Sequence, residues 1–222
     1  ELLAEAGFEV VIPDAQVCCG ALHAHGGDMA AARDLARRNI RAFREAGVDY
    51  IVSNAGGCGA LLVEYDHLLK DDPGLAEDAA WFAERVVDVA ELLRRGRPLA
   101  FASPEPVRVT YQDSCHLRNV MKSSGAPRAL IAGVDGVEFC EMAEADRCCG
   151  SAGIYNITQP EMSGAILAHK MEHANATGAD VILTSNPGCL LQMKLGIERH
   201  GDPSRTKAAH VVDFLYERIK KA

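Results

Sequence analysis

Apolar and polar positions along the chain follow two periods, one typical of strands and one typical of helices. Short β-rich apolar runs predict strands at residues 8–12, 50–53, 107–112, 137–142 and 181–184. Helical spacing occurs at residues 2–6, at 29–46, at 117–131 with an interruption at 123–127, at 160–177 and at 190–199. The pattern therefore predicts strands that alternate with helices.

This alternation predicts parallel sheets, because a helix between two strands returns the chain through a right-handed crossover. The loops that follow parallel strands all lie at the carboxyl edge of the sheet, where binding sites form. We expect an α/β fold of two tandem repeats, each a small parallel sheet flanked by helices.

Cysteines in these loops occur twice in the same arrangement. Cys18-Cys19-Gly20 is followed by Cys58, and Cys148-Cys149-Gly150 is followed by Cys189, at spacings of 40 and 41 positions from the first cysteine of each pair. Residues 46–54 also align with 177–186, and Val-Val-Asp occurs at 86–88 and at 211–213 before helical patterns. The sequence therefore predicts two copies of one fold, with cysteines at the carboxyl ends of strands.

Two segments that contain prolines, 96–98 and 103–106, separate the copies and have the composition of a linker. We expect a first repeat at residues 1–100 and a second repeat at 101–222. Cys115 precedes the second cysteine pair by 33 positions, and its counterpart in the first copy would fall before residue 1. The first repeat is therefore expected to be N-terminally truncated.

Composition narrows the function classes. The 222 residues are 48% hydrophobic and 24% charged, as in globular proteins, and the net charge of −8 argues against a nucleic-acid partner. Five arginines at positions 33, 37, 38, 41 and 44 are interpreted as a solvated helix face or a docking patch for an acidic partner. The sequence has no apolar run of about 18 residues and no secretory signal pattern, which favours an intracellular location.

In a reducing compartment the eight cysteines are interpreted as metal ligands rather than disulfides. Four thiolates suit an iron-sulfur cluster or a tetrahedral zinc ion, and the ligand count leaves both open. The vicinal pairs differ from the C-x-x-C spacing of zinc ribbons and ferredoxins, so an unusual cluster is a hypothesis. The predicted ligands are Cys115, Cys148, Cys149 and Cys189 in the second repeat and Cys18, Cys19 and Cys58 in the first.

Other residues give weaker signals. Cys140 lies outside the repeated pattern and is interpreted as a small core residue. His169 and His173 are four positions apart without the H-E-x-x-H motif, so a surface or packing role is favoured. Three histidines beside cysteines are candidates for tuning a cluster or replacing a ligand, namely His23, His25 and His116.

No phosphate loop, dinucleotide fingerprint or nucleophile elbow occurs in the sequence. Three interpretations stay open. The first is an iron-sulfur electron carrier, the second is a structural or docking module that holds zinc, and the third is a thiol-disulfide enzyme that uses Cys148 and Cys149 directly.

The cysteine segments resemble the paired CCG cysteine-rich domains of the glycolate oxidase iron-sulfur subunit family. These domains are related to those of the lactate-utilisation iron-sulfur protein and of heterodisulfide reductase. The likeness is carried by 57–65, 111–118 and 186–193 in addition to the cysteines. It implies an electron-transfer subunit, itself non-catalytic, with a 4Fe-4S or non-cubane cluster and zinc as an option at one site.

The resemblance also implies a flavoprotein partner that oxidises glycolate, with electrons passing toward quinone. The location implied is the cytoplasm or, through the complex, the inner face of the membrane. Members of this family carry an N-terminal ferredoxin-like domain with two clusters, which we expect to be missing from this chain. The heterodisulfide reductase pattern ends in C-x-x-C, whereas Cys58 and Cys189 lack that fifth cysteine. Direct disulfide reduction is therefore disfavoured.

Overall fold

The structure is a computed structural model that describes residues 1–220. Elements of the first half are α1 (Leu2–Glu5), α2 (Ala21–His25), α3 (Met29–Ala46), β1 (Ile51–Ser53), α4 (Gly56–Leu62), α5 (Tyr65–Leu68), α6 (Ala76–Arg85), β2 (Val86–Asp88) and α7 (Val89–Arg95). Elements of the second half are β3 (Phe101–Gln112), α8 (Cys115–Asn119), α9 (Gly125–Ala132), β4 (Val134–Phe139), α10 (Tyr155–Thr158), α11 (Pro160–Ala176), β5 (Val181–Thr184), α12 (Pro187–His200), β6 (Lys207–His210) and α13 (Val211–Tyr216).

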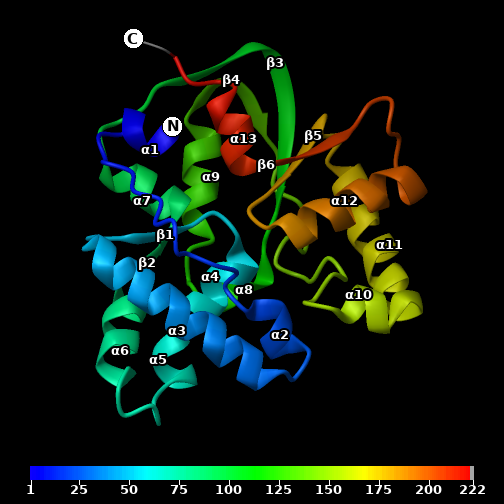
Figure 1. Cartoon of the computed structure of the whole chain (residues 1–222). Coiled ribbons are helices and arrows are strands. Elements are labelled where there is room, and N and C mark those ends of the chain that lie inside the picture. Colours follow the sequence, from blue (N-terminus) through cyan, green and yellow to red (C-terminus); the bar gives the residue numbers. More distant parts are fainter. Residues whose placement is uncertain (221–222) are drawn as a thin grey trace.

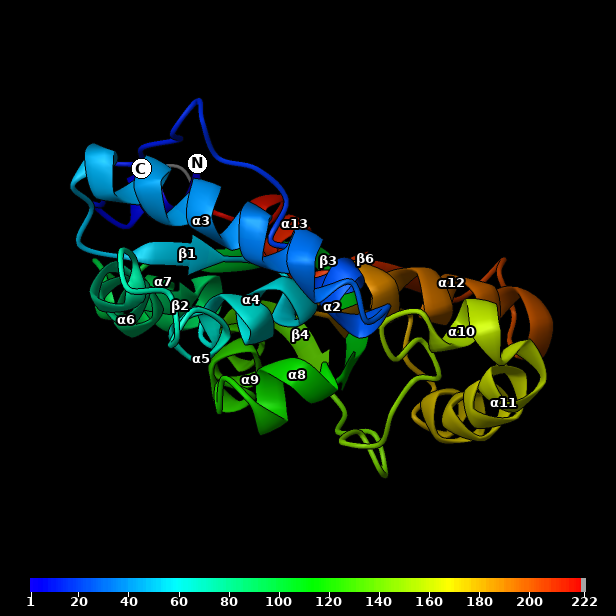
Figure 2. The same cartoon turned by 60° about the horizontal axis from the view of Figure 1, so that its bottom comes forward.

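A four-stranded parallel sheet organises the second half, with the order β4-β3-β5-β6. Val109 of β3 pairs with Phe139 on one side and with Val181 on the other, so β3 is a central strand. The first half has a smaller parallel sheet of β1 and β2, in which Ile51 pairs with Val86. Parallel sheets flanked by helices are therefore confirmed, and α3 lies along one side of β1 (Figures 1 and 2).

Three apolar clusters hold these layers together. One contains Ile40, Tyr65 and Phe82 and joins α3, α5 and α6 to β1. A second joins α1 and α7 to the larger sheet, so its residues come from both sides of residue 100. The third packs α11 and α12 against β5 and includes Cys149 and Cys189. The boundary at residue 100 stays a prediction.

Several predicted elements agree with the structure at their ends. The helix at 29–46 and the strand at 181–184 have the predicted bounds. Asp28 caps α3 by accepting a hydrogen bond from the Ala31 N–H at 3.0 Å, and Gly47 ends the helix with a φ of 63°. An N-cap and a left-handed glycine are local signals, so the sequence alone defines this helix.

Other predictions were wrong. Residues 8–12 form no strand, because their backbone finds no neighbouring strand to pair with and Val10, Val11 and Ile12 stay exposed. Residues 103–106, predicted as a linker, lie within β3, where the pairing with β4 shifts register between Ala102 and Val107. The proline-rich segment there is tolerated at an irregularity of the ladder.

The repeated Val-Val-Asp motif does not mark equivalent positions. Residues 86–88 form β2, whereas 211–213 begin α13. The residues that correspond are the helix caps, since Asp88 accepts from the Ala90 N–H and His210 accepts from the Val212 N–H. The two copies therefore share the strand-to-helix junction and not the motif.

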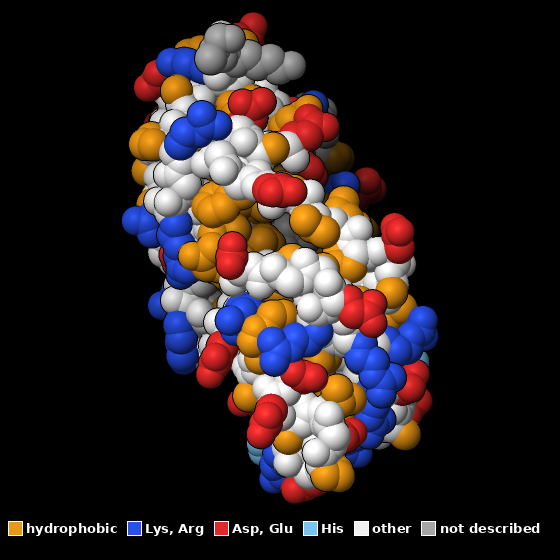
Figure 3. Space-filling model, turned by 60° about the vertical axis from the view of Figure 1, so that its left-hand side comes forward, with side chains coloured by type: hydrophobic (Ala, Val, Ile, Leu, Met, Phe, Trp, Pro, Cys, Tyr) orange, Lys and Arg blue, Asp and Glu red, His pale blue; other side chains and the backbone are white. Residues whose placement is uncertain are grey.

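Two of the five arginines of α3 form ion pairs within the chain. Arg37 contacts Asp72 at 2.8 Å, Arg44 contacts Asp78 at 2.6 Å and lies over the ring of Trp81. Figure 3 shows Lys and Arg side chains gathered on the lower part of one face, with acidic side chains among them. The ion pairs and the mixture of charges favour the interpretation of the arginine-bearing side of α3 as a solvated helix face. Among residues 1–220, no helix has the length and apolarity that crossing a bilayer requires.

Candidate metal centre

Four cysteines of the second half follow three adjacent parallel strands. Cys115 begins α8 just after β3, Cys148 and Cys149 lie in the loop after β4, and Cys189 lies in the first turn of α12 after β5. Because β4, β3 and β5 are neighbours in the sheet, these loops meet at one edge. Residues more than 70 positions apart thus reach the same place.

The thiols form a row in this place. The thiol of Cys115 donates to Cys148, which raises the pKa of Cys115 and lowers that of Cys148. Cys149 interacts with both Cys148 and Cys189, which raises the pKa of Cys149, and the interaction with Cys149 lowers the pKa of Cys189. The four predicted cysteines are therefore brought together, while their role as metal ligands stays a prediction.

Hydrogen-bond donors point at the sulfurs. The Gly150 N–H donates to Cys148 Sγ at 3.3 Å, and the side-chain amide of Asn186 donates to Cys189 Sγ at 3.5 Å. Gly150 can turn its N–H toward the sulfur because its φ of 94° favours glycine. Such donors stabilise a thiolate and suit sulfur that carries negative charge.

The cysteines of the first half form a smaller group. The thiol of Cys19 donates to Cys58. This hydrogen bond is the largest cause that lowers the pKa of Cys58 to about 7. The Gly20 N–H donates to Cys18 Sγ at 3.5 Å, as the Gly150 N–H does in the second copy. Cys18 is exposed, so this group is the more open of the two.

Polar side chains that the sequence did not reveal hold both cysteine-pair loops. Buried Asn39 of α3 donates to the Cys18 carbonyl at 3.1 Å, and Tyr65 donates to the Cys19 carbonyl at 2.8 Å. Ser163 of α11 donates to the Gly150 carbonyl at 2.9 Å, and Gln192 donates to Ser163. An isolated polar residue in an apolar helix face is the only signal that could have found them.

A buried cation lies beside the second group. Lys170 on α11 is only 1% exposed, and its ammonium donates to the Glu144 carbonyl at 2.5 Å. Burial lowers the pKa of Lys170, and the nearby Cys149 and Asp146 oppose that shift. A positive charge in this position favours negative charge on the thiols.

The two cysteine groups are neighbours in space. Asn186, three residues before Cys189, accepts a hydrogen bond from the Gly57 N–H at 2.9 Å, next to Cys58. Gly56 at the start of α4 lies against Ser114 at the start of α8, and a Cβ there would collide with the Ser114 hydroxyl. Glycine thus allows the helices that carry Cys58 and Cys115 to approach closely.

The three candidate histidines separate into two kinds. The rings of His25 and His116 lie 5.4 Å apart, and burial lowers the pKa of His116. His116 Nδ1 is 4.0 Å from Cys115 Sγ. His23 instead contacts Asp28 at 3.7 Å and is half exposed. His25 and His116 therefore belong to the space between the cysteine groups.

The prediction that Cys140 is a small core residue was wrong. It follows β4 directly, its N–H donates to the Val109 carbonyl at 2.8 Å, and it is half-buried rather than a core residue. Cys140 belongs to neither cysteine group, so its substitution serves as a control that leaves the sulfurs of both groups in place.

Known proteins have sequences similar to that of this chain. The model of the CCG cysteine-rich domain matches residues 1–63 and 109–194. The probable glycolate oxidase iron-sulfur subunit of Bacillus subtilis is 53% identical over 98% of this chain, and the chain spans 49% of that relative's length. Lactate utilization protein A of Geobacillus thermodenitrificans is 31% identical, with 98% of this chain and 90% of the relative covered. The resemblance inferred from the sequence is confirmed, and the chain belongs to the CCG cysteine-rich domain family.

Proposed function

We propose that this chain is the cysteine-ligated part of an iron-sulfur electron-transfer subunit in a flavin-dependent 2-hydroxy-acid dehydrogenase. The observation that carries the proposal is the meeting of four thiols at the carboxyl edge of three adjacent strands. The name of the 53% identical relative supports it. Residues 1–100 and 101–222 would be two CCG repeats, in line with the two matched segments.

In this proposal Cys115, Cys148, Cys149 and Cys189 hold one iron-sulfur cluster. The donor set fits an anionic cluster, since four sulfurs are accompanied by N–H donors and by the buried ammonium of Lys170. Bound there, the cluster would supply one-electron redox chemistry. The chain's own residues would fix its position, partly exclude water and set its potential.

The shape of the sulfur row favours a cluster over a single zinc ion. Tetrahedral zinc at about 2.3 Å from sulfur sets its ligand atoms about 3.8 Å apart. Within residues 1–220, the ligand group whose atoms all lie within 4.8 Å of one another is Glu144, His169 and His173, which includes no cysteine. In the described part of the chain no three cysteine sulfurs lie within 4.8 Å of one another, and this wider spacing suits a larger inorganic core.

Cys18, Cys19 and Cys58 would hold a second metal centre, with zinc or a cluster as the outcomes of metal analysis. Its closeness to the first group, through Asn186 and Gly57, supports electron exchange between them. Exposed Cys18 and the openness of this group favour it as the side that faces a partner.

The partner in this proposal is a flavoprotein subunit that oxidises glycolate and delivers electrons to this chain. A quinone would accept them further along, by an indirect contact with the membrane. The higher identity to the glycolate oxidase relative, against 31% and 32% for two lactate utilization proteins, favours glycolate over lactate. The free cysteines suit the cytoplasm, where thiols stay reduced.

The test is electron transfer in the assembled complex. The flavoprotein and the full-length iron-sulfur subunit are mixed with glycolate without oxygen, and the visible absorbance of the cluster is followed by stopped flow. Wild type and Cys140→Ser are expected to bleach to the same extent, whereas Cys149→Ser is expected to keep flavin reduction and to lose the share of the bleaching that belongs to the cluster held by Cys149. Equal bleaching in Cys149→Ser, or bleaching by lactate alone, would overturn the assignment.

A further inference from the structure

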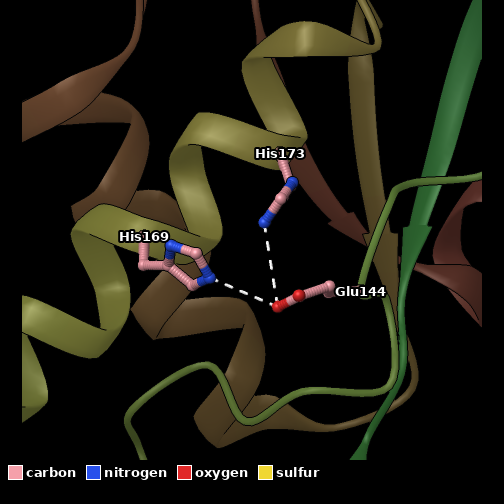
Figure 4. Close-up of side chains that lie close together, drawn as sticks. All are labelled: Glu144, His169 and His173. Atoms are coloured by element: carbon pink, nitrogen blue, oxygen red, sulfur yellow. Dashed lines mark hydrogen bonds and ion pairs between the residues drawn. The ribbon is translucent and has the colours of Figure 1, made fainter.

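A second cluster of metal-binding side chains lies on α11, outside the cysteine rows. His169 and His173 are one turn apart on this helix, and Glu144 approaches both from the loop after β4. Figure 4 shows the two rings and the carboxylate pointing toward one another. The sequence alone favours a surface or packing role for the histidines, because they lack the H-E-x-x-H motif, and Glu144 lies 25 positions before His169.

The ligand atoms are spaced as a metal ion requires. Glu144 Oε2 lies 3.2 Å from His169 Nε2 and 3.8 Å from His173 Nε2, and the three ligand atoms all lie within 4.8 Å of one another. A tetrahedral zinc ion with bonds of about 2.0–2.2 Å separates its ligand atoms by about 3.3 Å. Small side-chain rotations would bring these atoms to that spacing.

One ligand atom has no hydrogen-bond partner in the described residues. His173 Nε2 is buried and faces the Glu144 carboxylate from beyond hydrogen-bonding distance. A buried ring nitrogen without a partner costs free energy, and a metal bond would remove that cost. The rings of His169 and His173 are nearly perpendicular, at 85°, and Figure 4 shows a nitrogen of each ring turned toward the Glu144 carboxylate.

The surroundings hold the ligands in position. The buried Lys170 ammonium donates to the Glu144 carbonyl at 2.5 Å and so anchors the loop on the same helix. Glu144 has a φ of 51°, an uncommon conformation for this residue type that directs its side chain to α11. Glu172 Oε2 lies 3.6 Å from His169 Nδ1 and can orient that ring from outside, as carboxylates do for metal-bound histidine.

We propose that Glu144, His169 and His173 bind one divalent transition-metal ion of the zinc type. Two histidines and one carboxylate match the ligand preference of zinc, and the exposed side chains of His169 and Glu144 leave a fourth position for water. The ion would clamp the 141–147 segment to α11, directly before Cys148. The site would therefore stiffen the loop that carries the cysteine pair, whatever the cysteines bind.

The test counts zinc in matched variants of the chain purified without oxygen. Each protein is dialysed against Zn²⁺ and analysed for bound metal, and the zinc X-ray absorption spectrum reports its ligands. Wild type is expected to bind one more zinc per chain than His173→Gln and His169→Gln. His67→Gln, which changes an exposed histidine of α5, is the matched control and is expected to behave as wild type.

The additional zinc of wild type is expected to show nitrogen and oxygen neighbours, including imidazole, without sulfur. Loss of a direct ligand is expected to weaken binding by more than the about 10–100-fold that loss of an outer partner costs. Circular dichroism of the metal-free variants checks that they fold. Equal zinc content in all four proteins, or a difference spectrum with sulfur neighbours only, would overturn the proposal.

Discussion

The Gly57 N–H donates to the side-chain oxygen of Asn186 at 2.9 Å across 129 positions of sequence. The amide nitrogen of the same side chain donates to Cys189 Sγ at 3.5 Å. A second bond, from the Gly56 N–H to the Ser185 carbonyl at 3.0 Å, runs alongside. The turn after β1 is therefore joined to the turn after β5, and one side chain links the two cysteine groups.

Asn186→Asp is expected to lower the reduction potential of the proposed cluster. The change removes the donor to Cys189 Sγ and adds a negative charge beside sulfur, and both effects disfavour the reduced form. Redox titration followed by EPR measures the potential. Asn54→Asp is the matched control, since Asn54 follows β1 as Asn186 follows β5 but is exposed. Equal shifts in both variants would rule out this role for Asn186.

Asp88 makes stability depend on pH. Burial raises its folded-state pKa to about 6, above the unfolded value of about 3.9, and its Oδ2 is buried without a partner among the described residues. The protonated carboxyl therefore favours the fold below pH ~4, and this contribution, on the order of 3 kcal/mol, is lost as pH rises through about 6.

Asp88→Asn keeps the acceptor for the Ala90 N–H and has no proton to lose. Between pH 4 and 7 the wild type is therefore expected to lose stability relative to this variant. Urea unfolding at several pH values measures the difference. A constant difference across that range would show that Asp88 does not ionise as described.

Asp113 is a buried charge that two arginines neutralise. Its carboxylate contacts Arg118 at 2.8 Å and Arg128 at 2.6 Å, two residues before Cys115. Asp113→Asn is expected to lower the free energy of unfolding by about 2 kcal/mol, because hydrogen bonds to buried charged groups are lost. Asp135→Asn breaks an exposed pair with Lys220 and is expected to leave thermal unfolding unchanged. Similar melting shifts in both variants would contradict this account.

Gly150, directly after the second cysteine pair, and Gly164 in α11 differ in the space around them. An added methyl group would meet different surroundings at the two positions. Gly150 has a φ of 94°, and a Cβ there would lie 2.7 Å from the Ser163 carbonyl oxygen, whereas a Cβ at Gly164 in α11 meets no atom within 4 Å. Gly150→Ala is expected to destabilise the chain by more than ~2 kcal/mol. Gly164→Ala is expected to stabilise it by ~0.5–1 kcal/mol. Chemical denaturation measures the free energy of unfolding of both variants. A change of the same sign in this free energy for Gly150→Ala and Gly164→Ala would refute the expectation.

Local signals account for the parts of the fold that the sequence predicted. Asp28 and Gly47 define α3, and the run at 181–184 is a strand because its apolar residues are buried in the middle of a sheet. The segment at 8–12 has similar strand propensity and fails for a nonlocal reason, the lack of a neighbouring strand. Strand propensity read from one sequence does not report whether a neighbouring strand is present to pair with.

The repeated spacing predicted which thiols would meet, because loops after parallel strands share an edge. The groups that support them come from other elements and carry no spacing signal. Lys170 has the sequence pattern of a helix-surface residue, yet it is buried beneath the loop of Glu144. The same loop brings Glu144 to His169, and that contact depends on the packing of the loop after β4 against α11 and not on a motif.

The central claim is that Cys115, Cys148, Cys149 and Cys189 hold one iron-sulfur core, and iron analysis of the chain purified or reconstituted without oxygen tests it most directly. Iron and sulfide are counted, and the iron X-ray absorption spectrum and EPR of the reduced protein identify the cluster. The account predicts sulfur-ligated iron that is lost in Cys149→Ser and in Cys189→Ser but retained in Cys140→Ser. Iron that is absent from wild type, or retained unchanged in Cys149→Ser and Cys189→Ser, would contradict it.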